Sequence, residues 1–362
     1  MTAVLNRLAS RVVVGARTRG WAAYSRLFVV GDRGGWSVDE DADHVAAAAR
    51  RLGYELGPAA WAPAISEQAV FHTSHFEALS PRWLRSANRV GLAYMHGRPG
   101  TSGMPEFDAA FDALRRAADR IARVQVTHGE MEELVLAAGV APERVFRIPL
   151  GIDLENFPLG DAGRQAEARA TLGLPESAFV VGSFQKDGVG WGEGLEPKLI
   201  KGPDVLVRVL AQVQAAAPEL FVLLTGPSRG YVRGELERLG IPHRHLLARS
   251  REELARAYHA LDVCLVASRQ EGGPKAVLES MAAGVPLVCT RVGQAADLVE
   301  HGVNAALVAV EDVEALTEWT LRARKEGPGW RTAGRTTAEA YAHDRLDERW
   351  AALLEGFVER PS

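Results

Sequence analysis

Short apolar segments alternate with helical segments over the second half of the chain, and this alternation limits the fold more than any other feature. Proline stands at the first position of two of the helical segments, at Pro203 and Pro274. Strands that are apolar at consecutive positions are buried on both faces. The pattern therefore predicts a doubly wound parallel sheet of the α/β class. The predicted strands are FVVGSF (179–184), FVLLTG (221–226), LDVCLVA (261–267) and PLVCT (286–290).

The first half of the chain has a similar but less regular pattern, with predicted strands at 26–31, 69–74, 90–97 and 122–127. Because 362 residues exceed the size at which one hydrophobic core usually stops growing, two domains are expected. We place the first at 1–155 and the second at 156–342. The amphipathic segment 343–362 is expected to pack back on the first domain. Ligands of open α/β sheets bind at the carboxyl ends of the strands, so the strand-to-helix loops are where we look for functional residues.

Composition excludes several classes of protein. The chain is 47% hydrophobic and 24% charged, and its net charge of −4 gives no overall positive field for nucleic acid. No run of ~18 apolar residues is present, so no transmembrane helix is predicted. Cys264 and Cys289 lie in apolar strand segments and are expected to be buried free thiols, as in a reducing cytoplasm.

The N-terminal region is basic. Arg11 interrupts the apolar region that a signal peptide needs, so secretion is not expected. The region is either a solvated basic arm or a surface that touches anionic lipid or an acidic acceptor. We therefore expect a cytoplasmic protein, with peripheral contact at the inner face of the membrane as the second interpretation. The arginines that precede the first acid, Asp32, are Arg7, Arg11, Arg17, Arg19 and Arg26.

The stretch SRQEGGPKAVLES (268–280) combines residues that can hold a polar ligand at a sheet edge. Glu271 leaves the strand 261–267, and the two glycines after it have no side chains to block a ligand. Pro274 starts a helix whose N-terminus suits a phosphate, and Glu279 lies about a turn and a half further along that helix. Two acids so separated can hold hydroxyl groups at both ends of a sugar nucleotide. The alternative is a capping acid and a surface acid.

The longer segment SRQEGGPKAVLESMAAGVPLVCTRVGQAADLV resembles the E-x7-E region of the retaining family-4 glycosyltransferases of the GT-B fold. Those enzymes carry an EG-x-P-x4-E-A-M-A-x-G-x-P-V-V-x-T-x-x-G-G pattern here. This chain has Ser280 in place of the usual alanine and Gln294 in place of the second glycine. PERVFRIPLGIDLENF is similar to the family's inter-domain passage. The resemblance implies two Rossmann-like domains that face a central cleft, with an acceptor-side first domain and a donor-binding second domain.

The resemblance also implies a role for each part of this segment. Glu271 would contact hydroxyl groups of the donor sugar, and Glu279 would bind those of the ribose. The candidates that would line the donor diphosphate are Gly272, Gly273, Pro274 and Lys275.

The loop QKDGVGWGEGLEPKLIKG (185–202) is long for an α/β connection, and such loops are usually functional or disordered. In the resembled family, a basic residue directly after the first strand of the second domain and a lysine in a K-G pair hold the diphosphate. Lys186 and Lys201 match these positions. The family more often has arginine at the first position, so this chain keeps the charge but loses bidentate geometry. The alternative for both lysines is that they are solvated surface residues. Trp191 in this loop is a candidate lid residue.

Further candidates lie on other loops. Gly226 in TGPSRGYV would let the backbone approach a nucleotide, and Arg249 in LLARSREEL lies where, by the resemblance, backbone groups meet the base. Gly34 and Gly35 match the place of a family glycine loop near the donor phosphate, although no G-x-G-x-x-G fingerprint is present. His96 matches the place of a histidine beside the transferring sugar. Plain turns and a packed histidine are the alternatives.

The resemblance implies transfer of a sugar from a UDP- or GDP-sugar to an acceptor hydroxyl, with retention of configuration and without metal or a separate cofactor. The acceptor is a small molecule, a glycan or a lipid. No metal site is predicted, because His72 and His75 would point to opposite faces of a strand end. Three other functions stay open: a non-catalytic sugar-nucleotide sensor, a transferase that forms a C–N bond to a cyclitol, and a nicotinamide oxidoreductase.

Overall fold

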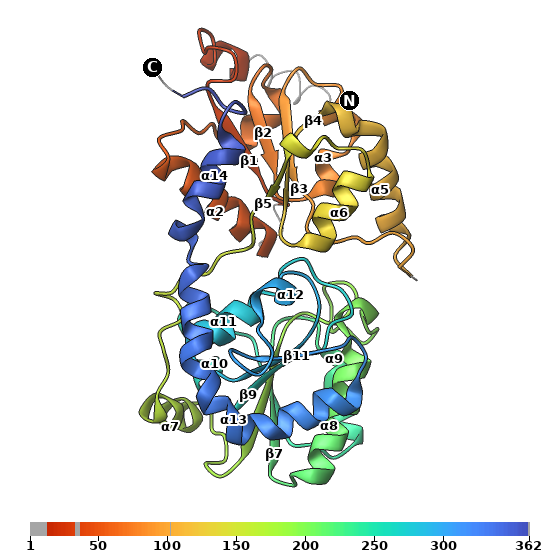
Figure 1. Ribbon diagram of the computed structural model, residues 1–362, viewed down its shortest axis with the longest axis vertical. Helices are drawn as coiled ribbons and strands as arrows, with labels where there is room; N and C mark the ends of the chain where they lie inside the picture. Colours follow the sequence, from red (N-terminus) through yellow and green to blue (C-terminus); the bar gives the residue numbers. More distant parts are fainter. Residues whose placement is uncertain (1–12, 33–36, 102, 361–362) are drawn as a thin grey trace. The chain divides into compact units, whose positions relative to one another are not determined.

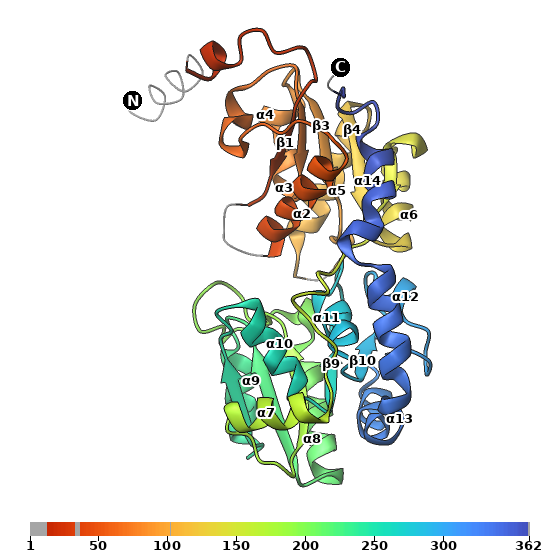
Figure 2. The same ribbon diagram turned by 90° about the vertical axis from the view of Figure 1, so that its left-hand side faces the viewer.

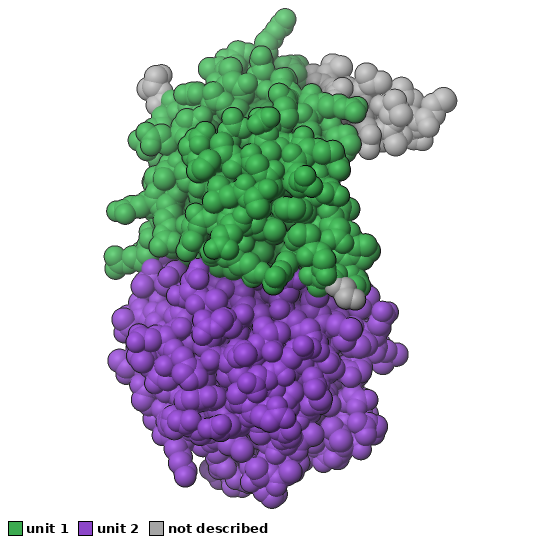
Figure 3. Space-filling view, turned by 45° about the vertical axis from the view of Figure 1, so that its right-hand side comes forward, with its two compact units in different colours: residues 1–150, 343–362 green, residues 151–342 purple. Residues whose placement is uncertain are grey.

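The computed structural model describes residues 13–32, 37–101 and 103–360. The chain divides into two compact units, which Figure 3 colours separately. Unit 1 consists of residues 1–150 and 343–362, and unit 2 consists of residues 151–342. The predicted first boundary is at 155, and the boundary in the structure lies slightly earlier, within the stretch PERVFRIPLGIDLENF (142–157) that resembles the family's inter-domain passage.

Unit 1 contains a five-stranded parallel sheet whose described strands follow the order of the sequence, β1-β2-β3-β4-β5. Helices lie in the connections between these strands, as a parallel sheet requires (Figure 1). The strands are β1 (Leu27–Val30), β2 (Ala69–His72), β3 (Arg89–Ala93), β4 (Ile121–Val126) and β5 (Val145–Arg147). The helices are α2 (Ser37–Arg51), α3 (His75–Ala78), α4 (Pro81–Leu84), α5 (Pro105–Ala117), α6 (Gly129–Ala137) and α14 (Asp347–Leu354).

Unit 2 contains a six-stranded parallel sheet of order β11-β10-β9-β6-β7-β8. The chain starts in the middle at β6, runs outward to β8, and then returns to β9 on the other side, so the order reverses between β6 and β9. The strands are β6 (Phe179–Phe184), β7 (Leu220–Thr225), β8 (His243–Leu246), β9 (Val263–Val266), β10 (Leu287–Thr290) and β11 (Ala306–Val308). The helices are α7 (Ala162–Thr171), α8 (Pro203–Ala216), α9 (Gly230–Arg238), α10 (Arg251–His259), α11 (Lys275–Ala283), α12 (Ala295–Leu298) and α13 (Val313–Ala340).

The strands of unit 2 are buried on both faces, which explains their continuous apolar sequence. In β6, Val180 packs toward one core cluster, whereas Phe179 and Val181 pack toward the other. Helices α7, α10 and α11 contribute to the first cluster, and α8, α9 and α13 as far as Trp330 contribute to the second. Figure 2 shows helices on both sides of this sheet. The predicted doubly wound α/β class is confirmed for this unit.

Proline stands at the start of two helices of unit 2, as predicted, although Pro274 lies one residue before the first helical position. Pro203 is the first residue of α8, and Pro274 is the N-cap of α11. Gly284 ends α11 at a φ of 71°, a left-handed conformation that favours glycine. Cys264 and Cys289 are buried free thiols, as predicted, and burial raises the pKa of Cys264 to about 12.

The C-terminal segment is part of unit 1. Arg51 of α2 holds Asp347 of α14 through two hydrogen bonds of 2.8 and 2.6 Å. The Trp350 ring packs edge-on against Phe71 of β2 with ring centroids 5.8 Å apart. Phe357 is fully buried, and a Cβ built on Gly91 of β3 would lie 3.0 Å from its ring and 2.9 Å from the Phe71 ring, so both rings pack closely on this glycine. The end of the chain therefore covers a face of the first sheet.

Part of the N-terminal basic region lies in the described residues. Arg26 forms an ion pair with Glu55, and its guanidinium lies 4.2 Å from the centre of the Trp21 ring. Arg7 and Arg11 lie outside the described residues. Among the residues that are described, no helix is both long and apolar enough to cross a bilayer. Contact of this region with a membrane stays a prediction.

Replacing Phe357 by alanine is expected to lower the free energy of unfolding by about 3 kcal/mol, because the cavity it leaves lies against β3. Chemical denaturation followed by circular dichroism measures the change. Leu136→Ala is the matched control in the same unit, since Leu136 is 37% exposed on α6, and its effect should stay within about 0.5 kcal/mol. Equal effects of the two substitutions would show that the C-terminal segment does not contribute to the core of unit 1.

Candidate functional site

The predicted residues Glu271 and Lys201 are in direct contact. Glu271 follows β9 and is buried, with 9% of its surface exposed. Its Oε2 accepts a hydrogen bond of 2.5 Å from the Lys201 ammonium, and its Oε1 accepts one of 2.8 Å from the Ser268 hydroxyl. The carboxylate is therefore held at both oxygens, by a cation on one side and a neutral donor on the other.

A close approach of two backbone segments places Lys201 beside Glu271. Gly202 has a φ of 63°, and a Cβ built on it would lie 2.0 Å from the carbonyl oxygen of Ala267. Only glycine permits both that conformation and that distance. The Arg269 amide donates to the Ile200 carbonyl across the same contact, at 2.8 Å. Lys201 and Gly202, the K-G pair of the sequence, thus form a turn that packs against the carboxyl end of β9.

Arg269 joins the same two segments through its side chain. Its guanidinium donates two hydrogen bonds of 2.7 Å to the Asp204 carboxylate and one of 2.7 Å to the Leu199 carbonyl. It also pairs with Glu311 at 2.6 Å. These hydrogen bonds raise the pKa of Arg269 further above its usual range. The turn that carries Lys201 is therefore fixed by a bidentate ion pair as well as by its backbone.

Lys186 lies directly after β6 and close to Lys201. Burial, and then the positive charge of Lys201, lower the pKa of Lys186. Its ammonium lies 4.0 Å from the centre of the Trp191 ring, a cation–π distance. Two ammonium groups near each other at the carboxyl edge of the sheet provide positive charge that suits an anion.

The loop between Lys186 and Lys201 is an anchored hairpin. Within it, the Val189 amide donates to the Glu196 carbonyl and the Lys198 amide donates to that of Asp187. The hairpin is fastened to the segment after β7, because the amides of Gly230 and Tyr231 donate to its carbonyls at 2.7 and 2.8 Å. Trp191 remains 54% exposed near the tip. Its predicted movement as a lid stays a prediction.

Glu279 has its own set of partners. It lies on α11 with 6% of its surface exposed. The Tyr258 hydroxyl donates to its Oε2 at 2.8 Å, and the Arg251 guanidinium lies 3.5 Å from its Oε1. Burial, followed by the Glu279 charge, raises the pKa of Tyr258. Sequence reasoning missed both partners, since neither stands next to the acid in the chain, and both lie on α10.

The glycine loop between the two acids is backed by another turn. Gly293 approaches it so closely that a Cβ there would lie 2.6 Å from the Gly272 carbonyl oxygen. The Gln294 amide donates to that same oxygen at 3.0 Å. Pro274 then caps α11 without a side-chain hydrogen bond, and Lys275, half-buried, is the first helical residue. The contacts with Gly293 and Gln294 thus fix the backbone of this loop.

The candidates on the neighbouring loops of unit 2 occupy the same carboxyl edge of the sheet. Gly226 follows β7 at a φ of 91°, and a Cβ there would lie 2.8 Å from the Gln185 carbonyl oxygen, beside Lys186. Arg249 precedes α10, and its amide donates to the Glu253 carboxylate at 2.7 Å. The Arg249 side chain itself is exposed.

The candidates in unit 1 are only partly described. His96 follows β3, and its ring lies 5.8 Å from that of His75 and 5.6 Å from that of Phe107. Burial, and then His96, lower the pKa of His75 to about 3. Gly34 and Gly35 lie outside the described residues.

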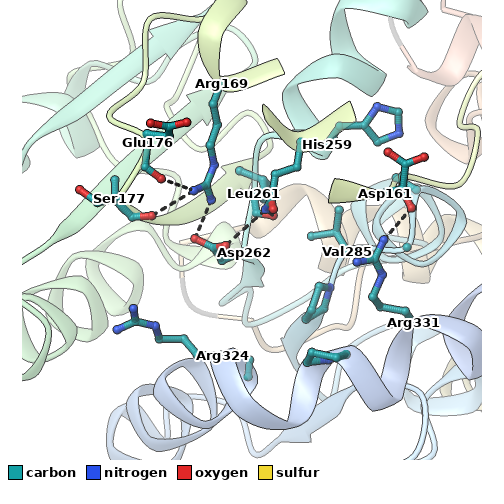
Figure 4. A pocket seen from close by; sticks show the side chains of 18 residues that line it. Asp161, Arg169, Glu176, Ser177, His259, Leu261, Asp262, Val285, Arg324 and Arg331 are labelled. Atoms are coloured by element: carbon teal, nitrogen blue, oxygen red, sulfur yellow. Dashed lines mark hydrogen bonds and ion pairs between the residues drawn. The ribbon is translucent and has the colours of Figure 1, made fainter. Parts of the chain in front are cut away.

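A pocket of about 370 Å³ lies at the opposite, amino edge of the sheet in unit 2 (Figure 4). It is lined by residues that precede β6, β9 and β10, and it contains none of the predicted site residues. Its charged groups serve the fold: Arg169 pairs with Asp262 at 2.8 Å, and Arg331 donates to the Gly160 carbonyl at 2.6 Å. We therefore assign the candidate site to the carboxyl edge.

Comparison with known proteins identifies the family of the chain. A family model described as glycosyl transferases group 1 matches residues 193–325, which include Lys201, Glu271 and Glu279. The D-inositol 3-phosphate glycosyltransferase 1 of Catenulispora acidiphila is 32% identical over 310 residues, which are 77% of this chain and 68% of that protein. The D-inositol 3-phosphate glycosyltransferase of Stackebrandtia nassauensis is 29% identical over 274 residues, and the chain spans only 58% of its length.

Solved structures share the fold at low sequence identity. Anabaena Alr3699/HepE in complex with UDP and glucose has a TM-score of 0.72 and 16% identity, covering 92% of this chain and 99% of that one. A glycosyltransferase from Rickettsia africae has a TM-score of 0.69 and 12% identity, covering 93% and 99%. Sucrose-phosphate synthase from Thermosynechococcus elongatus has a TM-score of 0.63 and 22% identity, covering 79% and 73%. Each unit is an α/β unit with a parallel sheet, and a relative is 32% identical over 77% of the chain. The chain therefore belongs to the group 1 glycosyltransferases and has their GT-B fold.

Proposed function

We propose that this glycosyltransferase moves a sugar from a nucleoside-diphosphate sugar, with UDP or GDP as the nucleotide, to an acceptor hydroxyl. The observation that carries the proposal is the contact between the Lys201 ammonium and the Glu271 carboxylate, 2.5 Å apart and next to Lys186. A cation for the diphosphate and an acceptor for sugar hydroxyls thus lie side by side at the carboxyl edge of one sheet. Relatives that act on sugars, and a structural neighbour solved with UDP and glucose, support the same donor class.

Lys201 can serve the donor without releasing Glu271. An ammonium group has three donors, so one hydrogen bond to Glu271 leaves two for phosphate oxygens. Lys186 supplies a second positive charge nearby, and the first turn of α11 supplies backbone amides. A diphosphate between them would relieve the mutual repulsion of the two ammonium groups.

The reaction breaks the bond between the anomeric carbon and the diphosphate oxygen, and it forms a bond from that carbon to the acceptor oxygen. Negative charge then grows on the leaving diphosphate, where the two lysines stabilise it. The acceptor proton passes to an oxygen of the leaving phosphate. Attack from the face that the leaving group vacates retains the configuration. Because ammonium groups neutralise the diphosphate, no metal ion is required in this scheme.

We propose that unit 1 binds the acceptor, and the family resemblance makes His96 the candidate residue of that unit. The names of the relatives make a phosphorylated cyclitol the first acceptor to assay, and a glycan or a lipid the next. A sensor without turnover is not favoured, because the relatives are named as transferases and the two acids are present.

Lys201→Ala is expected to weaken the binding of UDP or GDP by about tenfold to a hundredfold, since a charge-assisted hydrogen bond to phosphate is lost. Isothermal titration calorimetry measures the affinity. Lys325→Ala is the control, because Lys325 is exposed on α13. Equal affinities of wild type and the Lys201 variant would refute a diphosphate site at this turn.

Glu271→Ala is expected to reduce kcat by about a hundredfold while the nucleoside diphosphate still binds, because the carboxylate orients the donor sugar. Turnover with UDP- and GDP-sugars and an inositol phosphate acceptor is measured by mass spectrometry of the product. Glu252→Ala, at an exposed acid of α10, is the control. A variant that keeps wild-type turnover would remove Glu271 from the mechanism.

Transfer is expected to continue in excess EDTA, because lysine ammonium groups and helix amides neutralise the diphosphate. Initial rates with and without the chelator decide this, after dialysis of the enzyme against the same buffer. Complete loss of activity that Mg²⁺ or Mn²⁺ restores would contradict the metal-independent scheme.

A further inference from the structure

Resting on the proposed function, we propose that the buried pair Asp187–Arg229 is the positioning element for the diphosphate lysines, Lys186 and Lys201. The two residues of this pair reach no solvent and so do not touch the donor themselves. They act through the backbone on either side of Lys186.

Arg229 ties together the ends of two strands. It stands between β7 and α9, is 1% exposed, and is among the largest fully buried side chains of the described residues. Its Nη1 donates to the carbonyls of Ser183, Gln185 and Thr225 at 2.7, 2.9 and 2.8 Å. Its Nη2 donates to the Ser183 hydroxyl at 3.2 Å. One guanidinium thereby holds the carboxyl end of β6 in a fixed position relative to the carboxyl end of β7.

The same guanidinium contacts the residues on both sides of Lys186. It bonds the carbonyl of Gln185, the preceding residue, and its Nε lies 3.0 Å from the carboxylate of Asp187, the following residue. Both side chains of this ion pair are fully buried. The contact joins two opposite charges away from solvent. Any shift of Arg229 therefore moves the backbone that sets the direction of Lys186.

The restraint continues to Lys201. The Asp187 carbonyl accepts from the Lys198 amide at 2.8 Å, and the Lys198 carbonyl accepts from the Lys201 amide at 2.8 Å. The Gln185 side chain also donates to the Lys201 carbonyl at 2.9 Å. The two lysines are thus joined by one backbone link and one side-chain link, and both links begin at residues that Arg229 contacts.

Burying an ion pair carries a free-energy penalty, because both charges lose their hydration. Desolvation raises the pKa of Asp187 against the opposing effect of Arg229, and apolar residues of similar volume often replace such pairs without loss of stability. Apolar residues could not bind three carbonyls, however. The pair is better explained by the fixed geometry that it gives the loop than by stability alone.

A second pair in the same unit offers a matched control. Arg169 is also buried, binds Asp262 at 2.8 Å, and donates to the carbonyls of Ala260, Glu176 and Ala178 at 3.1, 3.1 and 3.3 Å. It lines the pocket at the amino edge of the sheet (Figure 4). The two arginines share their chemistry and unit but lie at opposite ends of the strands.

The test compares Arg229→Gln with Arg169→Gln by thermal unfolding and by calorimetric titration with UDP and GDP, below both melting temperatures. Both variants should melt earlier. Only Arg229→Gln should raise the Kd of the nucleoside diphosphate, by about tenfold, and the KM for the donor with it. Lys186→Ala should then add little in the Arg229→Gln background but keep its full effect in the Arg169→Gln background. Asp187→Asn, which preserves volume, provides the same measurement if Arg229→Gln does not fold.

Unchanged affinity in Arg229→Gln or Asp187→Asn would overturn this inference, as would full additivity with Lys186→Ala. Those outcomes leave the proposed function intact, provided that the wild type binds UDP or GDP and loses affinity with Lys201→Ala. A wild-type chain that binds neither nucleotide would overturn the proposed function itself and the inference with it.

Discussion

The close approach of Gly202 to the end of β9 is the constraint on which the site depends. A backbone turn can lie this near another strand only where no side chain intervenes, and here a Cβ would fall 2.0 Å from a carbonyl oxygen. The approach brings an ammonium and a carboxylate into contact. It also lets Arg269 close the junction with a bidentate pair to Asp204. The chemistry of the site therefore starts from a steric property of one glycine.

Unit 2 has a buried arginine paired with an aspartate at each edge of its sheet, and the two pairs contact different segments. At the amino edge, Arg169 and Asp262 join a helix and two strand entrances beside a pocket. At the carboxyl edge, Arg229 and Asp187 hold the loop that carries Lys186. Because the strands are parallel, all strand-to-helix loops leave on one side, and the loop residues with polar side chains gather there. The two ion pairs therefore lie at opposite ends of the strands, and only the pair of Arg229 and Asp187 adjoins the candidate site.

Much of the fold was predictable because its signals are local. Continuous apolar strands, a proline at the start of α8 and a glycine at the end of α11 each specify their own surroundings. The acids and lysines of the site were found by their resemblance to a family pattern. Tyr258, Arg251, Ser268 and Arg269 were not, since a partner's side chain is defined by the three-dimensional neighbourhood and not by sequence spacing.

The sequence by itself determined the class of fold and named the candidate residues on the strand-to-helix loops, because periodicity and motif spacing are properties of the chain. Only the tertiary structure decided that Lys201 contacts Glu271, that Glu279 is held by a tyrosine, and that Arg229 brackets Lys186. These contacts join residues that are distant in the chain. They form only when strands and loops are packed, and burial then fixes which charges meet.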